Sequence, residues 1–105
     1  MVEVSAELSL TGAENRSGAR FDTRMEAGVR HGSSRIPAIV TDLSAAGFRV
    51  ATEETLPAGA VVWVRLGALA PLMARVVWSD GPAAGCVFAA PLHPSVMEQL
   101  LGNSD

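Results

Sequence analysis

Residues 24–50 read RMEAGVRHGSSRIPAIVTDLSAAGFRV, and this stretch decides the fold class. At its start, Met25, Ala27 and Val29 alternate with polar residues or glycine, which is the period of a half-buried β-strand. Residues 31–34, HGSS, then predict a turn. The stretch therefore begins with a strand over residues 24–31 and not with a helix.

Two more strands follow within the same stretch. Residues 36–41 predict the second strand, and Pro37 near its start is typical of an edge position. Residues 42–46 predict a turn, and residues 48–50 predict a third short strand. Turn signals therefore recur every few residues, as they do in all-β domains.

The rest of the chain continues this pattern and ends in a helix. Runs rich in β-forming residues predict strands over residues 60–66, 72–79 and 85–89. Pro94 suits the first position of a helix, and Gly102 suits its end. The predicted apolar helix face consists of Val96, Met97, Leu100 and Leu101. About six short strands and one helix favour a mainly β fold, a small antiparallel barrel or sandwich capped by the helix.

Length and charge limit the classes of protein that the chain can belong to. With 105 residues we expect one domain, residues 14–105, after a flexible N-terminal arm of residues 1–13. No uncharged apolar run is long enough to cross a bilayer, and the N-terminus lacks the basic region of a signal peptide. Cytoplasmic residence is therefore the default expectation. The net charge of −3 argues against binding to a nucleic-acid polymer.

The sequence offers no catalytic or metal-binding constellation. Cys86 is the only cysteine and is expected to be a small buried hydrophobe. Neither His31 nor His93 has a short ligand spacing to it, so neither a metal nor another cofactor is predicted. No nucleophile-base pair or glycine-rich phosphate loop is visible, so the chain is not expected to be an enzyme. Trp63 and Trp78 lie in apolar strand runs, which favours core or barrel-surface packing over stacking on a ligand.

Three arginines at a spacing of four, Arg16, Arg20 and Arg24, lie in a segment that reads as a loop and reaches the start of the first predicted strand. Guanidinium groups match phosphates and guanine edges with two parallel hydrogen bonds, so the cluster fits a phosphorylated, planar ligand. The alternative is a solvated arm that forms weak surface ion pairs with nearby carboxylates.

A second polar motif, Asp42-x-Ser44-x-x-Gly47, separates the second and third predicted strands. Asp and Ser side chains often bond to nearby backbone and build tight turns, and Gly47 would then supply a positive φ or a bulge. Alternatively, the Asp42 carboxylate accepts from the N–H groups of a base and the Ser44 hydroxyl reaches a polar atom of the ligand. Both interpretations can hold together.

The two motifs in this order resemble the signature of the PilZ domain family, RxxxR followed by [D/N]xSxxG. The resemblance covers about residues 14–101 and implies a six-stranded antiparallel barrel with a C-terminal helix. It also implies binding of cyclic dimeric GMP, a bacterial second messenger. Arg16 and Arg20 would clamp the ligand, Asp42 and Ser44 would hold a guanine, and Gly47 would permit close approach.

The arginine pair and the ligand stoichiometry stay open at this point. Arg20 and Arg24 also satisfy RxxxR, although Phe21 after Arg20 favours the pair Arg16 and Arg20. Asn15 stands where many family members carry a further arginine, which leaves the number of bound ligands undecided.

The leading hypothesis is a receptor that passes the signal to a downstream protein partner by a conformational change. The alternative is an adaptor of the same fold that binds only protein. Either would be a monomer or a weak dimer, with the apolar helix face or a sheet edge as the candidate contact.

Overall fold

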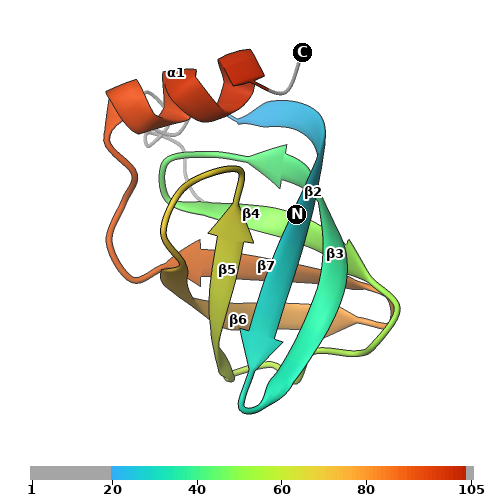
Figure 1. The fold of residues 1–105 in the computed structure, drawn as a ribbon. Coiled ribbons are helices and arrows are strands. Elements are labelled where there is room, and N and C mark those ends of the chain that lie inside the picture. Colours follow the sequence, from blue (N-terminus) through green and yellow to red (C-terminus); the bar gives the residue numbers. More distant parts are fainter. Residues whose placement is uncertain (1–19, 104–105) are drawn as a thin grey trace.

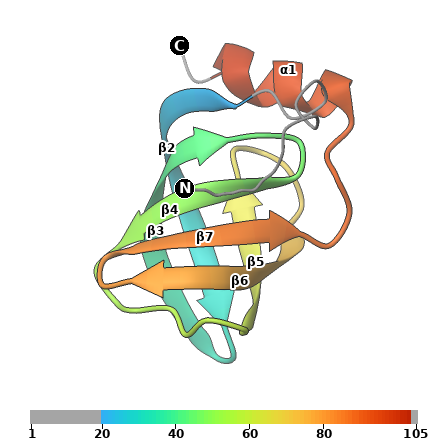
Figure 2. The same ribbon diagram turned by 180° about the vertical axis from the view of Figure 1, so that it is seen from behind.

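The computed structural model describes residues 20–103. Within this range six strands close into one antiparallel barrel in the order β2-β3-β4-β7-β6-β5, and β5 pairs back with β2 (Figures 1 and 2). The strands are β2 (Phe21–His31), β3 (Ser34–Leu43), β4 (Gly47–Thr52), β5 (Val61–Leu66), β6 (Leu72–Asp80) and β7 (Ala83–Phe88). Helix α1 (Pro94–Asn103) lies over one end of the barrel. The predicted six-stranded antiparallel barrel with a C-terminal helix is confirmed.

The core lies inside the barrel and forms because alternate strand residues are apolar. On β5, for example, Val62, Val64 and Leu66 point inward and are fully buried, whereas the residues between them face outward. Phe48 from β4 and Phe88 from β7 pack with their ring centroids 5.1 Å apart. Removing these apolar side chains from water is the main force that holds the closed sheet together.

The strands extend further than the sequence pattern indicated. β2 begins at Phe21, before the expected start at Arg24, and β3 continues through Leu43. Asp42 therefore lies in β3, directly opposite Asp22, and not in the turn where it was expected. The sequence pattern ended too early because β3 contains an extra residue, Thr41, that interrupts the alternation.

Pro37 occupies a position where β3 is paired on one side only. It lies opposite Gly28 on β2, and the pairing of β3 with β4 begins one residue later, at Ala38. From Ala38 onward β3 is paired with β2 on one side and with β4 on the other. The expected edge position is therefore a local one, at which the missing N–H group of proline breaks no ladder bond.

Helix α1 begins and packs largely as expected. Pro94 is its first residue, and His93 before it accepts a hydrogen bond at Nδ1 from the backbone N–H of Ser95 (3.1 Å). Met97 and Leu100 are buried against the barrel. The helix continues to Asn103, so Gly102 does not end it as predicted.

The two tryptophans lie on the outside of the barrel, which is the second of the two positions that the sequence favoured for them. Trp63 is 38% exposed and Trp78 is 41% exposed. Both lie in runs where nearly every residue is apolar, so the sequence did not show which residues point inward. Cys86 is buried as predicted, and desolvation raises the pKa of its thiol to about 12.

The predicted arm of residues 1–13 and Arg16 lie outside the described residues, so the boundary between arm and domain stays a prediction. Within residues 20–103, no helix is long and apolar enough to cross a membrane.

Candidate functional site

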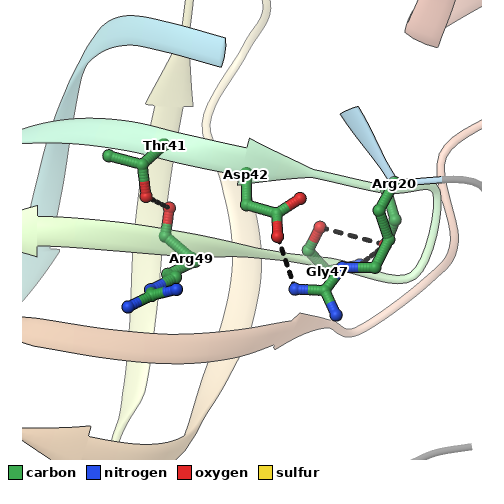
Figure 3. Close-up of polar contacts among 6 residues, drawn as sticks. Arg20, Thr41, Asp42, Gly47 and Arg49 are labelled. Atoms are coloured by element: carbon green, nitrogen blue, oxygen red, sulfur yellow. Dashed lines mark hydrogen bonds and ion pairs between the residues drawn. The ribbon is translucent and has the colours of Figure 1, made fainter. Parts of the chain in front are cut away.

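An ion pair joins the two sequence motifs. Nη2 of Arg20, at the start of the described chain, pairs with Oδ2 of Asp42 near the end of β3 (Figure 3). The Arg20 side chain is 67% exposed and that of Asp42 is 16% exposed. An ion pair this exposed contributes little to stability, so its importance lies in placing a guanidinium beside a carboxylate on the outer surface.

A β-bulge sets the direction of Asp42. The buried residues of β3 are Ile36, Ala38 and Val40, and the next one is Leu43 instead of residue 42. Two residues of β3, Thr41 and Asp42, occupy the space opposite Arg49 on β4, because Thr41 is the extra residue. The bulge therefore turns Asp42 toward the outside, where unbroken alternation would direct it into the core.

The turn after Asp42 is fixed by hydrogen bonds within the turn and by hydrogen bonds to neighbouring segments. The backbone N–H of Ser44 donates to the Gly47 carbonyl (2.9 Å). The Ser44 hydroxyl accepts from the Gly47 N–H (3.2 Å) and donates to the Gly47 carbonyl (3.3 Å). The carbonyls of Ala45 and Ala46 accept from the backbone N–H groups of Leu92 and Phe88, both at 2.8 Å. Strand β7 and the segment before α1 thus fix the turn on the barrel.

Gly47 is required by the packing of two strands. A Cβ atom at this position would lie 2.2 Å from the carbonyl oxygen of Cys86 on β7. Gly47 does not belong to the described glycines with positive φ, and it is a regular strand residue opposite Val87. The expected positive φ or bulge at Gly47 is therefore wrong. The close approach that it permits within the structure is between β4 and β7.

Arg49 and Trp78 extend the polar surface beside Asp42. Arg49 lies opposite Asp42 in the β3–β4 ladder, and its guanidinium carbon lies 5.7 Å from the centre of the Trp78 ring. The indole of Trp78 covers Gly85 so closely that a Cβ atom there would lie 2.1 Å from its Nε1 atom. Arg49 belongs to neither sequence motif, and its place between the apolar residues Phe48 and Val50 was the signal in the sequence that it faces outward.

The other predicted arginines are not brought into this cluster. Arg24 is exposed on β2, at the bulge between Asp22 and Met25, and forms no ion pair or side-chain hydrogen bond within residues 20–103. Arg16 lies outside that range. The described geometry thus assembles Arg20, Asp42, Ser44 and Gly47 and leaves the second arginine of the pair undecided.

The assembled groups suit binding more than chemistry. They offer a guanidinium fork, a carboxylate acceptor and a flat cation-aromatic surface, which together match phosphates and the edges of bases. Among the described residues, no group of three or more His, Cys, Asp or Glu side chains could hold a metal ion.

Comparisons with known proteins agree with this description. The family described as "PilZ domain" matches residues 14–103 of the chain. A solved structure, "Crystal structure of PilZ domain of CeSA from cellulose synthesizing bacterium", superposes with a TM-score of 0.62 at 20% sequence identity. The alignment covers 83% of this chain and 99% of that chain, and at this identity it shows a shared fold. The comparison with curated proteins found no match.

Proposed function

The chain belongs to the PilZ domain family, and from this premise we propose that it is a receptor for cyclic dimeric GMP which signals to a protein partner by changing conformation. PilZ domains are non-catalytic receptor domains that typically bind this nucleotide. The proposal includes a cytoplasmic location, where the chain would meet the second messenger, and no further cofactor.

The ion pair between Arg20 and Asp42 is the observation that carries the proposal. It connects the arginine motif to the DxSxxG motif across the outside of the barrel, although 22 residues separate the two side chains. A cyclic dinucleotide presents phosphates and the O6 and N7 acceptors of guanine to an arginine, and guanine N–H donors to a carboxylate. The two partners of the ion pair are therefore the two kinds of group that the ligand needs.

Binding would exchange this ion pair for contacts to the ligand. Asp42 would accept from the N–H groups of one guanine, and Arg20 would turn to a phosphate or to a guanine edge. Arg16 would be the second clamp, with Arg24 as the alternative. A ligand can shift a conformational equilibrium only by its different affinity for the two states, and this exchange of partners supplies such a difference.

Ser44 would contact the ligand as an acceptor. Its hydroxyl proton is directed to the Gly47 carbonyl and one lone pair accepts from the Gly47 N–H, which leaves one lone pair. A donor on the nucleotide, such as an N–H or a ribose hydroxyl, could occupy it. Gly47 would contribute by keeping the turn on the barrel.

Equilibrium titration of fluorescently labelled cyclic dimeric GMP into single-alanine variants tests the site. Arg16→Ala and Arg20→Ala should each weaken binding by at least about tenfold, since charged hydrogen bonds contribute roughly 1.5–3 kcal/mol. Arg24→Ala should bind like the wild type if Arg16 is the second clamp and should lose binding if Arg24 is. Circular dichroism should show that all three variants remain folded. Undiminished binding by both Arg16→Ala and Arg20→Ala would contradict the site assignment.

A further inference from the structure

The outside of the barrel has an apolar depression that the proposed nucleotide site does not use. Outward-facing Val61, Met73, Val77 and Val87, from β5, β6 and β7, are each 41–52% exposed. They line a depression of about 280 Å³, in which Arg75 is the only charged lining residue. Outward positions of a sheet in contact with water are usually polar, and a contiguous apolar surface commonly marks an interaction site.

Arg75 lies in the middle of this apolar surface. In the strand registers it is directly opposite Val61 on β5 and directly opposite Val87 on β7. Side chains at such positions have Cβ atoms roughly 5 Å apart. An apolar group entering the depression would therefore come within reach of the Arg75 guanidinium.

More positive charge lies along the neighbouring row of side chains. Trp63 on β5 is opposite Met73 on β6 and opposite Arg30 on β2, and Arg30 is in turn opposite Arg35 on β3. Like charges directly opposite each other destabilise a sheet. Within residues 20–103, neither arginine forms an ion pair that would offset this repulsion, and neither does Arg75. This arrangement of arginines does not stabilise the fold, whereas it would stabilise a complex with an acidic partner.

We propose that this surface binds an acidic segment of a separate protein, in which an apolar side chain is flanked by Asp or Glu. We name it the β5–β6 surface and define it by Val61, Trp63, Met73, Arg75 and Val87. The apolar side chain enters the depression, and the flanking carboxylates pair with Arg75 and with Arg30.

The shape and charge of the surface favour this partner over other anions. A nucleic acid has no aliphatic side chain to fill the depression, and a bilayer meets a protein as a plane. The net charge of −3 gives the chain as a whole no attraction for a polyanion. Strand addition is not an option on this face, because β5, β6 and β7 are paired on both sides in the closed barrel.

Selection of short random peptides displayed on phage against the full chain tests the proposal. The selected peptides should carry an aliphatic or aromatic residue next to Asp or Glu. Fluorescence anisotropy with a labelled selected peptide should show at least about tenfold weaker binding for Arg75→Glu, as expected for reversing the charge of a central contact. The double variant Val61→Thr/Val87→Thr, which keeps the branched shape but adds hydroxyls, should lose a similar amount.

Three controls make the result specific. Arg24→Glu makes the same charge change on β2, outside the β5–β6 surface, and should bind the peptide like the wild type. A peptide with its acidic residues replaced by Lys should prefer Arg75→Glu over the wild type. Arg75→Glu should still bind cyclic dimeric GMP, and the peptide measurement needs no nucleotide, so failure of the proposed receptor function would leave it intact.

Five results would overturn the proposal. Selection could yield no acidic-apolar consensus, or peptide binding could be unchanged in Arg75→Glu. Arg75→Glu could abolish nucleotide binding, which would assign the surface to the nucleotide. The wild type could also bind phosphatidylglycerol vesicles or oligothymidylate but no peptide, and Arg75→Glu could abolish that binding, which would assign the surface to those ligands. Peptide binding only by the variant Glu3→Ala/Glu7→Ala would assign the surface to the chain's own acidic first residues.

Discussion

Asp42 is the residue on which nucleotide recognition depends in this account. It lies directly opposite Asp22, so two carboxylates face each other across β2 and β3, and Arg20 pairs with Asp42. The two aspartates differ in this partner and in sequence context, since only Asp42 belongs to the DxSxxG motif. They therefore form a matched pair for mutation.

Asp42→Ala should weaken binding of cyclic dimeric GMP by about tenfold to a hundredfold, because alanine offers no acceptor for the N–H groups of the base. Asp22→Ala removes the same charge at the facing position and should change affinity by less than about threefold. Fluorescence anisotropy with labelled nucleotide measures both. Equal losses in the two variants would mean that net charge, and not Asp42 itself, determines affinity.

Gly47 belongs to the DxSxxG motif and also allows β4 and β7 to pack closely. Gly47→Ala would bring a Cβ atom to 2.2 Å from the Cys86 carbonyl oxygen, so β4 and β7 would have to separate. We expect it to lower the free energy of unfolding by at least about 2 kcal/mol in urea denaturation. Loss of ligand binding in this variant would then follow from a displaced turn.

Gly28→Ala is the control for that substitution. Gly28 is also a strand glycine without positive φ, and a Cβ atom there would meet nothing within 4 Å. Its stability should stay within about 0.5 kcal/mol of the wild type. A Gly47→Ala variant as stable as Gly28→Ala would show that the close contact of β4 with β7 is not needed.

The sequence predicted Asp42, Ser44 and Gly47 as one motif but not the surroundings that complete the site. Arg49 was not selected, because a single charged residue in a strand is usually only a solvated one. The position of Trp78 depends on Gly85, whose missing side chain makes room for the indole across the β6–β7 ladder. Such a contact between two strands cannot be recognised from the apolar periodicity of either strand alone.

Among the structural elements, the bulge in β3 has the largest effect on the site. It shifts the inward-facing series from Val40 to Leu43 and leaves Asp42 outside. The predicted strand ended at Thr41 because the alternation of apolar residues stops there. Periodicity can detect the interruption, but it cannot distinguish a bulge from the end of a strand.

Deleting Thr41 should therefore abolish nucleotide binding and lower the thermal midpoint of unfolding. Without the extra residue Asp42 would point into the apolar core, where an unpaired carboxylate costs several kcal/mol. Thr41→Val keeps the residue count and loses only the 3.5 Å hydrogen bond to the Arg49 carbonyl, so it should bind normally. A deletion variant that binds like Thr41→Val would contradict the assigned role of the bulge.

The buried thiol of Cys86 should make the stability of the barrel depend on pH. Burial raises the pKa of the thiol from 9.0 to about 12, so the folded state retains the proton over this interval while the unfolded state loses it. The associated stability is fully present below pH 9 and is lost as the pH rises toward 12, with a slope of up to about 1.4 kcal/mol per pH unit. Urea unfolding from pH 8 upward should show this loss in the wild type and a shallower one in Cys86→Ala. Parallel pH dependences would contradict the buried, protonated thiol.

Local sequence patterns did not decide whether the strands close into a barrel. A barrel and a sandwich have the same strand alternation, and the distinction rests on the pairing of β2 with β5. That pairing joins Ala27 to Leu66 and Arg30 to Trp63, residues far apart in the sequence. Resemblance to a family supplied this information, whereas the strands, turns and terminal helix followed from turn residues and apolar periodicity.

Isothermal titration calorimetry of the purified chain with cyclic dimeric GMP, with GTP as the control, tests the receptor function most directly. We expect saturable heat with cyclic dimeric GMP and none with GTP, and the stoichiometry would settle the number of bound ligands that Asn15 leaves undecided. Absence of heat with cyclic dimeric GMP from a folded sample would contradict the receptor function. The chain would then be an adaptor of the same fold that binds only protein.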